Sequence, residues 1–311
     1  MKPGSIFSRT KRGSVASLGE EELIRRVRRW LGTASPPPPA GIGDDCAVLA
    51  PARGRELLTI DPVLLGIHFD GGIPPRAVGA KLFKRNLSDI AAMGGRPRAA
   101  VVALALDGRV SLAWLAGFYR GIAAESRRWA VPVVGGDLAR LPGAFVATLA
   151  LTGEAPGRIL TRTGARVGDW IYVTGSLGRS RSTGHHASFT PRLTEGSWLA
   201  RQRVVRSMMD VSDGLAKDLR ALAPPGAVAA LEAALLPRRA GASVGEALGD
   251  GEDYELVFSV TGRTRPSPLE KKWARAFPRT RLSCIGRFVR QGALPRGALD
   301  LGNYRGYEHL R

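Results

Sequence analysis

The sequence predicts an α/β protein built from two domains. Its 311 residues are enough for two cores of ordinary domain size. Hydrophobic residues make up 44% of the chain and glycines number 39, a composition typical of soluble proteins with many tight turns. Short apolar runs rich in β-branched residues alternate with longer amphipathic stretches, and this pattern favours sheets covered by helices.

The first amphipathic stretch begins at Ser17–Glu20, which has the spacing of a capping box. Leu23, Val27 and Leu31 fall on one helical face, while arginines cover the opposite, solvated face. Four prolines within Ser35–Ala40 then exclude regular structure. The other elements expected in the first half are strands over 46–50, 57–60, 66–69, 99–106, 131–134 and 145–153, and helices over 76–93 and 111–129.

The second half of the chain shows the same alternation of expected strands and helices as the first half. It does not repeat the first half's sequence. His185 and His186 lie in a short polar segment, where a loop is favoured over a metal site, and 245–249 is expected to be a turn. The expected strands are 170–174, 207–211, 255–260 and 281–288, the expected helices are 215–222 and 269–277, and 227–236 is apolar.

Aspartates recur at the ends of the apolar runs and in glycine turns. Asp44 and Asp45 are adjacent, and two neighbouring carboxylates repel one another. Such a pair caps a helix, faces solvent or holds a cation; the strand expected at 46–50 argues against a cap. Asp213 is also placed to cap the helix that follows it. The recurrence predicts a shared site for two or more Mg²⁺ ions, with carboxylate ligands from Asp44, Asp61, Asp89, Asp137, Asp210 and Asp213.

The charge and the cysteines restrict the function classes. The net charge is +19, but the arginines are spread along the whole chain without an aromatic-interleaved stripe, so general basicity is favoured over nucleic-acid binding. No apolar run approaches the ~20 residues that span a membrane. Cys46 and Cys284 both lie in apolar runs and are expected to be structural free thiols in a reducing cytoplasm. Zinc is disfavoured because there is no CxxC pair.

Eight segments in order resemble the motifs of the thiamine-monophosphate kinase family. That family belongs to the aminoimidazole ribonucleotide synthetase-like superfamily, so the resemblance implies a two-domain α/β fold with domains over 17–155 and 156–311. Residues 1–16 precede it and are expected to form a basic, disordered extension. The segments are GIGDDCAVL (41–49), DPVLLGIHF (61–69), NLSDIAAM (86–93), GGD (135–137), LTRTG (160–164), GDWIYVTG (168–175), MDVSDGLAKDL (209–219) and GEDYEL (251–256).

The resemblance also implies an activity: Mg²⁺-assisted transfer of the ATP γ-phosphate onto thiamine monophosphate. A homodimer paired through the first domain's sheet is implied as well. The acceptor is itself a phosphate, so no general base is needed and no catalytic residue is assigned. The implied metal ligands are the six aspartates above together with Thr59 and Ile60. The implied ATP-binding residues are Gly136, Asp137, Arg162 and Ser212, and the implied substrate-binding residues are His68, Glu252 and Tyr307.

Two alternatives stay open. One is another ATP-dependent enzyme of the same superfamily with a different acceptor, and the other is a non-catalytic nucleotide- or nucleic-acid-binding protein. The chain departs from the family at Ile60, at Leu138 and over 179–186. His68 and Tyr307 also have plain structural readings, as a core histidine and as an anchor of the tail. The motif order and the retained aspartates favour the kinase.

Overall fold

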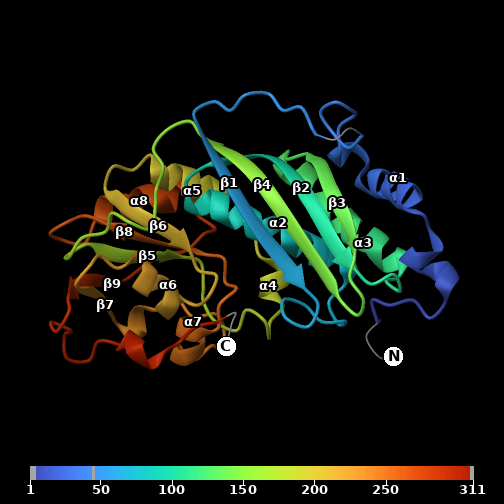
Figure 1. Ribbon diagram of the computed structural model, residues 1–311. Coiled ribbons are helices and arrows are strands. Elements are labelled where there is room, and N and C mark those ends of the chain that lie inside the picture. Colours follow the sequence, from blue (N-terminus) through green and yellow to red (C-terminus); the bar gives the residue numbers. More distant parts are fainter. Residues whose placement is uncertain (1–4, 44–45, 309–311) are drawn as a thin grey trace. The chain divides into compact units, whose positions relative to one another are not determined.

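Four strands form a sheet in the order β1-β4-β2-β3 (Figure 1). β2 and β3 are parallel and are joined by helix α3, whereas β2 and β4 are antiparallel. The computed structural model describes residues 5–43 and 46–308. The bounds are β1 Arg55–Leu64, β2 Arg96–Leu106, β3 Val133–Arg140, β4 Phe145–Ala155 and α3 Leu112–Trp129.

Helices cover one face of this sheet and leave the other open. Helix α2 (Pro75–Ala92) and α3 lie behind the sheet in Figure 1, and helix α1 (Glu20–Leu31) packs on α3. Aromatic rings fill the layer between them: Trp114 lies 4.9 Å from Phe145 and 5.8 Å from Phe118, centroid to centroid. The first pair is edge-to-face and the second is stacked, and both geometries add to the free energy gained by burial.

A second sheet has five strands in the order β6-β8-β5-β9-β7, and each neighbouring pair is antiparallel. Helices α6 and α7 bury leucines against its core. The strands are β5 Trp170–Thr174, β6 Val205–Asp210, β7 Ala227–Leu231, β8 Leu256–Val260 and β9 Leu282–Arg290; the helices are α4 His185–Ser188, α5 Leu193–Ala200, α6 Leu215–Leu222, α7 Val244–Gly249 and α8 Ser267–Ala276.

The chain divides into two compact units. The first comprises 1–87 and 96–154, and the second comprises 88–95 and 155–311. The last turn of α2 therefore belongs to the second unit. In the part of the chain that the structure describes, no helix is long and apolar enough to cross a membrane.

The expected disordered extension is wrong for residues 5–16. Ile6 is 2% exposed, and isolated β-bridges join Phe7 to Val110 and Ser14 to Ser111. The apolar residues of this segment pack against the rest of the first unit. The segment's basic composition gives no indication of this packing. The short 3₁₀ turns of the chain are η1 Lys11–Gly13, η2 Val15–Ser17, η3 Gly32–Ala34, η4 Ala233–Leu235 and η5 Leu301–Asn303.

Other local predictions are also wrong. Residues 46–50 form no strand, and Val48 is 64% exposed. Cys46 is therefore an exposed thiol, whereas Cys284 is buried in β9 as expected. Residues 66–69 form a turn closed by one bridge rather than a strand.

Three further differences concern helices. Residues 244–249 form α7 instead of a turn, because Ser243 and Glu246 make a reciprocal capping box. The pair His185 and His186 begins α4 instead of lying in a loop. The cap of α1 is Gly19, which makes no side-chain hydrogen bond, so the expected capping box at Ser17–Glu20 is absent.

Candidate active site

Strand β6 delivers a buried carboxylate to a turn in the second unit. Asp210 is the last residue of β6 and is 3% exposed. Its Oδ2 accepts a hydrogen bond of 2.7 Å from Ser88 Oγ, in the last turn of α2. Asp89 follows Ser88 and is half-buried. The sequence motifs around Asp89 and Asp210, 121 residues apart, thus meet within one unit.

The turn after β6 is held by Asp218 of helix α6. Its Oδ2 accepts from the backbone N–H groups of Ser212 (3.1 Å) and Asp213 (3.2 Å). Burial, followed by the charges of Asp210 and Asp213, raises the pKa of Asp218 to about 8. Burial and two neighbouring carboxylates disfavour ionisation of Asp218, and carboxylate oxygens are the ligands that a hard cation such as Mg²⁺ prefers. The chemistry of this turn fits Mg²⁺.

The loop Gly251–Glu255 is joined to the same turn by backbone hydrogen bonds. Glu252 N donates to Ser212 O at 2.7 Å, and Tyr254 N donates to Val211 O at 2.8 Å. Glu252 and Tyr254 have φ of 54° and 51°, in the left-handed region that side chains other than glycine rarely adopt. Non-glycine residues there cost roughly 1–2 kcal/mol each, so the surrounding contacts must hold the loop in place.

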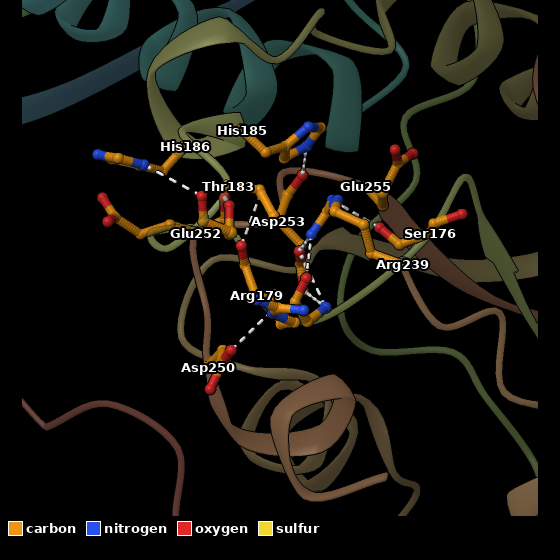
Figure 2. A network of polar contacts seen from close by, with 12 residues as sticks. Ser176, Arg179, Thr183, His185, His186, Arg239, Asp250, Glu252, Asp253 and Glu255 are labelled. Atoms are coloured by element: carbon orange, nitrogen blue, oxygen red, sulfur yellow. Dashed lines mark hydrogen bonds and ion pairs between the residues drawn. The ribbon is translucent and has the colours of Figure 1, made fainter. Parts of the chain in front are cut away.

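The three acids of this loop have different surroundings (Figure 2). Asp253 is 1% exposed and accepts from Arg239 Nη1 at 2.9 Å and from the N–H of Gly178 at 3.0 Å. Burial nevertheless raises the pKa of Asp253 to about 6. Glu255 accepts hydrogen bonds from Arg192 Nη2 at 2.6 Å and from Arg192 Nε at 2.7 Å. The remaining acid, Glu252, is half-buried.

Residues 179–186, where the sequence departs from the family, contact this loop. Ser180 Oγ donates to Glu252 O at 2.6 Å, and His185 Nε2 donates to Asp253 O at 3.1 Å (Figure 2). Arg181 lies 3.9 Å from the Glu252 carboxylate. These residues thus support the loop through hydrogen bonds of their own, although their sequence differs from that of the family.

The C-terminal tail reaches the same turn. Tyr307 N donates to Asp213 O at 2.8 Å, and its side chain is 38% exposed. Lys217 Nζ lies 2.8 Å from Asp213 Oδ2, and this contact raises the lysine pKa. The tail backbone is therefore bound directly to the acidic turn at Tyr307.

In the first unit, Asp61 lies inside β1 rather than at a strand end. Arg85 Nη2 lies 3.3 Å from its Oδ1, and Arg85 Nη1 donates to Pro62 O at 2.6 Å. Arg85 is 7% exposed, and a buried cation next to Asp61 lowers the negative charge that Asp61 offers to a metal. Along β1, Thr59 is half-buried and Ile60 is 65% exposed on the alternate face.

Gly136 and Asp137 lie inside β3, not in a loop after a strand. A Cβ on Gly136 would lie 2.1 Å from Val102 O, so glycine permits the close pairing of β2 and β3. A cavity of about 140 Å³ adjoins Gly136 and Asp137, with mainly apolar walls that include Tyr119.

β1 and β3 are the two edges of the first sheet, so Asp61 and Asp137 are separated by three strand spacings. That is roughly 14 Å, too far for a single ion to bind both carboxylates within one copy of the chain. The two carboxylates would therefore bind different ions, which the predicted site with two or more Mg²⁺ ions allows.

His68 is 6% exposed, and its Nδ1 accepts from Leu64 N at 3.2 Å. Lys81 Nζ donates to the carbonyl of His68 at 2.7 Å. One ring nitrogen therefore stabilises the turn after β1, which is the structural reading of this histidine.

Comparisons with known proteins identify the family. Residues 43–155 match the family described as "AIR synthase related protein, N-terminal domain". The chain is 35% identical over 279 residues to the thiamine-monophosphate kinase of Synechococcus elongatus, covering 80% of this chain and 84% of that protein. The chain belongs to the thiamine-monophosphate kinase family.

Solved structures of this kinase family share the fold. The thiamine-monophosphate kinase of Stenotrophomonas maltophilia K279a is 30% identical, with a TM-score of 0.71 over 88% of this chain and 95% of that one. The structure of AaThiL complexed with AMPPCP and TMP is 27% identical, with a TM-score of 0.70 over 98% of this chain and 100% of that one.

The sequence-predicted residues of this kinase fall into two groups. The second unit brings five of them to neighbouring loops: Asp210, Ser212, Asp213, Glu252 and Tyr307. Arg162, also in the second unit, is exposed. Asp44 lies outside the described residues. Across the residues that are described, no three His, Cys, Asp or Glu side chains are already arranged to hold a metal ion.

Sequence reasoning missed the residues that support the site. Asp218 and Lys217 lie inside the motif MDVSDGLAKDL (209–219), whose pattern predicts only a helix at these positions. Arg192 and Arg239 pair with the acidic loop from positions 63 and 14 residues away. The one signal that could have indicated these two arginines is that a buried carboxylate is normally paired with a cation.

Proposed function

We propose that this chain transfers the γ-phosphate of ATP to the phosphate of thiamine monophosphate, giving thiamine diphosphate and ADP. The observation that carries the proposal is family membership, with 35% identity over 80% of the chain. The acidic turn, the Glu252 loop and the tyrosine tail support it, because they gather charge, hydrogen-bonding and stacking groups in one place.

Mg²⁺ is the proposed cofactor. The donor set is Asp44, Thr59, Asp61, Asp89, Asp137, Asp210 and Asp213, with the backbone carbonyl of Ile60. The mutual repulsion of Asp210, Asp213 and Asp218 fits a site completed by cations. Bound Mg²⁺ would neutralise phosphate charge during transfer. The separation of Asp61 from Asp137 favours several ions over one.

The chain's own groups have distinct proposed roles. Gly136, Asp137, Arg162 and Ser212 hold ATP, with the apolar cavity beside Gly136 as a place for its base. Glu252 faces the cationic thiamine, Tyr307 stacks on it, and His68 assists at its phosphate. The acceptor phosphate is mostly ionised at neutral pH, so no base is assigned and positioning carries the catalysis.

The proposed assembly is a cytoplasmic homodimer that pairs through the first unit's sheet. Leu58 and Ile60 of β1 are 74% and 65% exposed, and Val101 of β2 is 39% exposed. Apolar residues on an open sheet face mark a surface for a partner, and a second copy fits it by symmetry.

An assay of the purified protein with ATP, Mg²⁺ and thiamine monophosphate tests the function directly. Thiamine diphosphate and ADP are expected in equal amounts. Glu252→Gln and Tyr307→Ala should each raise the KM for thiamine monophosphate at least about tenfold and leave the KM for ATP within about twofold. Turnover with another phosphorylated acceptor, and none with thiamine monophosphate, would contradict the assignment.

A further inference from the structure

The tail from 301 to 308 runs along helix α6, and a cation of that helix holds its first part. Arg220 Nη1 donates to Leu301 O at 2.8 Å, and Arg220 Nη2 donates to Arg305 O at 2.9 Å. The tail's backbone carbonyls are thus hydrogen-bonded to a charged donor, which is stronger than a neutral contact.

Lys217, one turn earlier on α6, holds the rest of the tail. Its Nζ donates to Tyr307 O at 2.7 Å and lies 2.8 Å from Asp213 Oδ2 and 3.6 Å from Glu308 Oε1. Only 29% of the Lys217 side chain is exposed. A Cβ on Gly306 would lie 2.8 Å from the Lys217 Cβ, so the tail lies directly on the lysine stem. One ammonium group therefore joins the acidic turn to the tail.

We propose that Lys217 is a positioning residue that fixes the Tyr307 ring beside the Asp213 turn before the acceptor binds. A tail held in advance loses less conformational entropy when it closes on a ligand, so binding is tighter. The inference rests on the proposed function, because Tyr307 is the proposed thiamine contact. Lys217 is then the residue that assembles the acceptor side of the site.

The test compares Lys217→Met, which keeps the stem and removes the charge, with Lys217→Arg, which restores a charged donor. Lys271→Met makes the same change on exposed α8 and is the matched control. We expect Lys217→Met to raise the KM for thiamine monophosphate about tenfold and to change kcat and the KM for ATP by less than about twofold. Hydrogen exchange at the Tyr307 amide, which Asp213 O now protects, should accelerate.

Lys217→Arg should recover most of both effects, and Lys271→Met should behave as the wild type. Wild-type exchange and an unchanged KM in Lys217→Met would overturn the proposal. An equal rise in the KM for ATP would also overturn it, because the lysine would then act on the whole site. If the wild type makes no thiamine diphosphate, the proposed function fails, while amide exchange still decides whether Lys217 holds the tail.

Discussion

At the scale of single residues, Asp253 gives the protein a pH-dependent stability. Burial raises its pKa to about 6 from the ordinary 3.8, so the folded state binds this proton more tightly than the unfolded chain. The resulting stability is complete below about pH 4 and is lost as the pH rises through about 6, with an upper limit of about 3 kcal/mol.

Asp253→Asn should remove this dependence. Urea unfolding at several values between pH 4 and pH 7 should show the wild type losing stability relative to the variant as the pH rises. The contact with Arg239 is already contained in the pKa of about 6, because arginine stays charged over this range and only Asp253 titrates. Asp70→Asn changes an exposed aspartate and serves as control. A constant difference between wild type and Asp253→Asn across this range would refute the expectation.

The same residues show what a sequence can reveal about a site. Asp210, Asp213 and Glu252 could be singled out because each lies in a short motif of polar and small residues. The motif GEDYEL does not say which of its acids is available to a ligand. Asp253 pairs with Arg239 and Glu255 pairs with Arg192, whereas Arg181 lies 3.9 Å from Glu252, and these pairings depend on tertiary contacts.

At the scale of elements, helices α2 and α3 pack closely because glycines lie at their contact. A Cβ on Gly121 would be 2.0 Å from Arg76 O, a backbone atom that cannot move without shifting α2. Gly121→Ala should therefore destabilise the first unit by about 1–3 kcal/mol through overpacking.

The control is Gly249→Ala in helix α7, where a Cβ meets nothing within 4 Å. Alanine there should be neutral or stabilising by up to about 1 kcal/mol, from helix propensity. Urea unfolding followed by circular dichroism measures both variants. Equal stability of the two variants would show that the α2–α3 contact tolerates a larger separation.

Elements with a strong hydrophobic pattern could be predicted, and elements set by context could not. Strands such as β5 and β9 are buried along most of their length because each has a neighbouring strand on both sides. Residues 46–50 have a similar composition, but no neighbouring strand pairs with them and Val48 is exposed. Helix α7 depends on its cap more than on periodicity, so its short sequence predicts a turn.

At the scale of the whole molecule, the net charge of +19 is spread over both units instead of forming one site. Several arginines are engaged internally, as Arg85 is with Asp61 and Arg192 with Glu255. The others raise the local concentration of polyanionic substrates. Composition therefore favours anionic ligands without locating their site, and the acidic turn with its loops is the proposed place where they bind.

The open face of the first sheet leads to a prediction about assembly. Leu58 and Ile60 project from β1 on the same side, two residues apart, and both are largely exposed. Burying two such side chains in a dimer contributes about 3–6 kcal/mol, so Leu58→Glu with Ile60→Glu should raise the dimer Kd at least about a hundredfold.

Light scattering coupled to size-exclusion chromatography should give a dimer for the wild type and a monomer for the double variant, with unchanged circular dichroism. Val167→Glu places the same charge on an exposed valine of the second unit and should leave the dimer intact. Because Thr59 and Asp61 alternate with these residues along β1, loss of the dimer is expected to lower kinase activity as well. A wild type that stays monomeric at all concentrations would show that the apolar face serves a different partner.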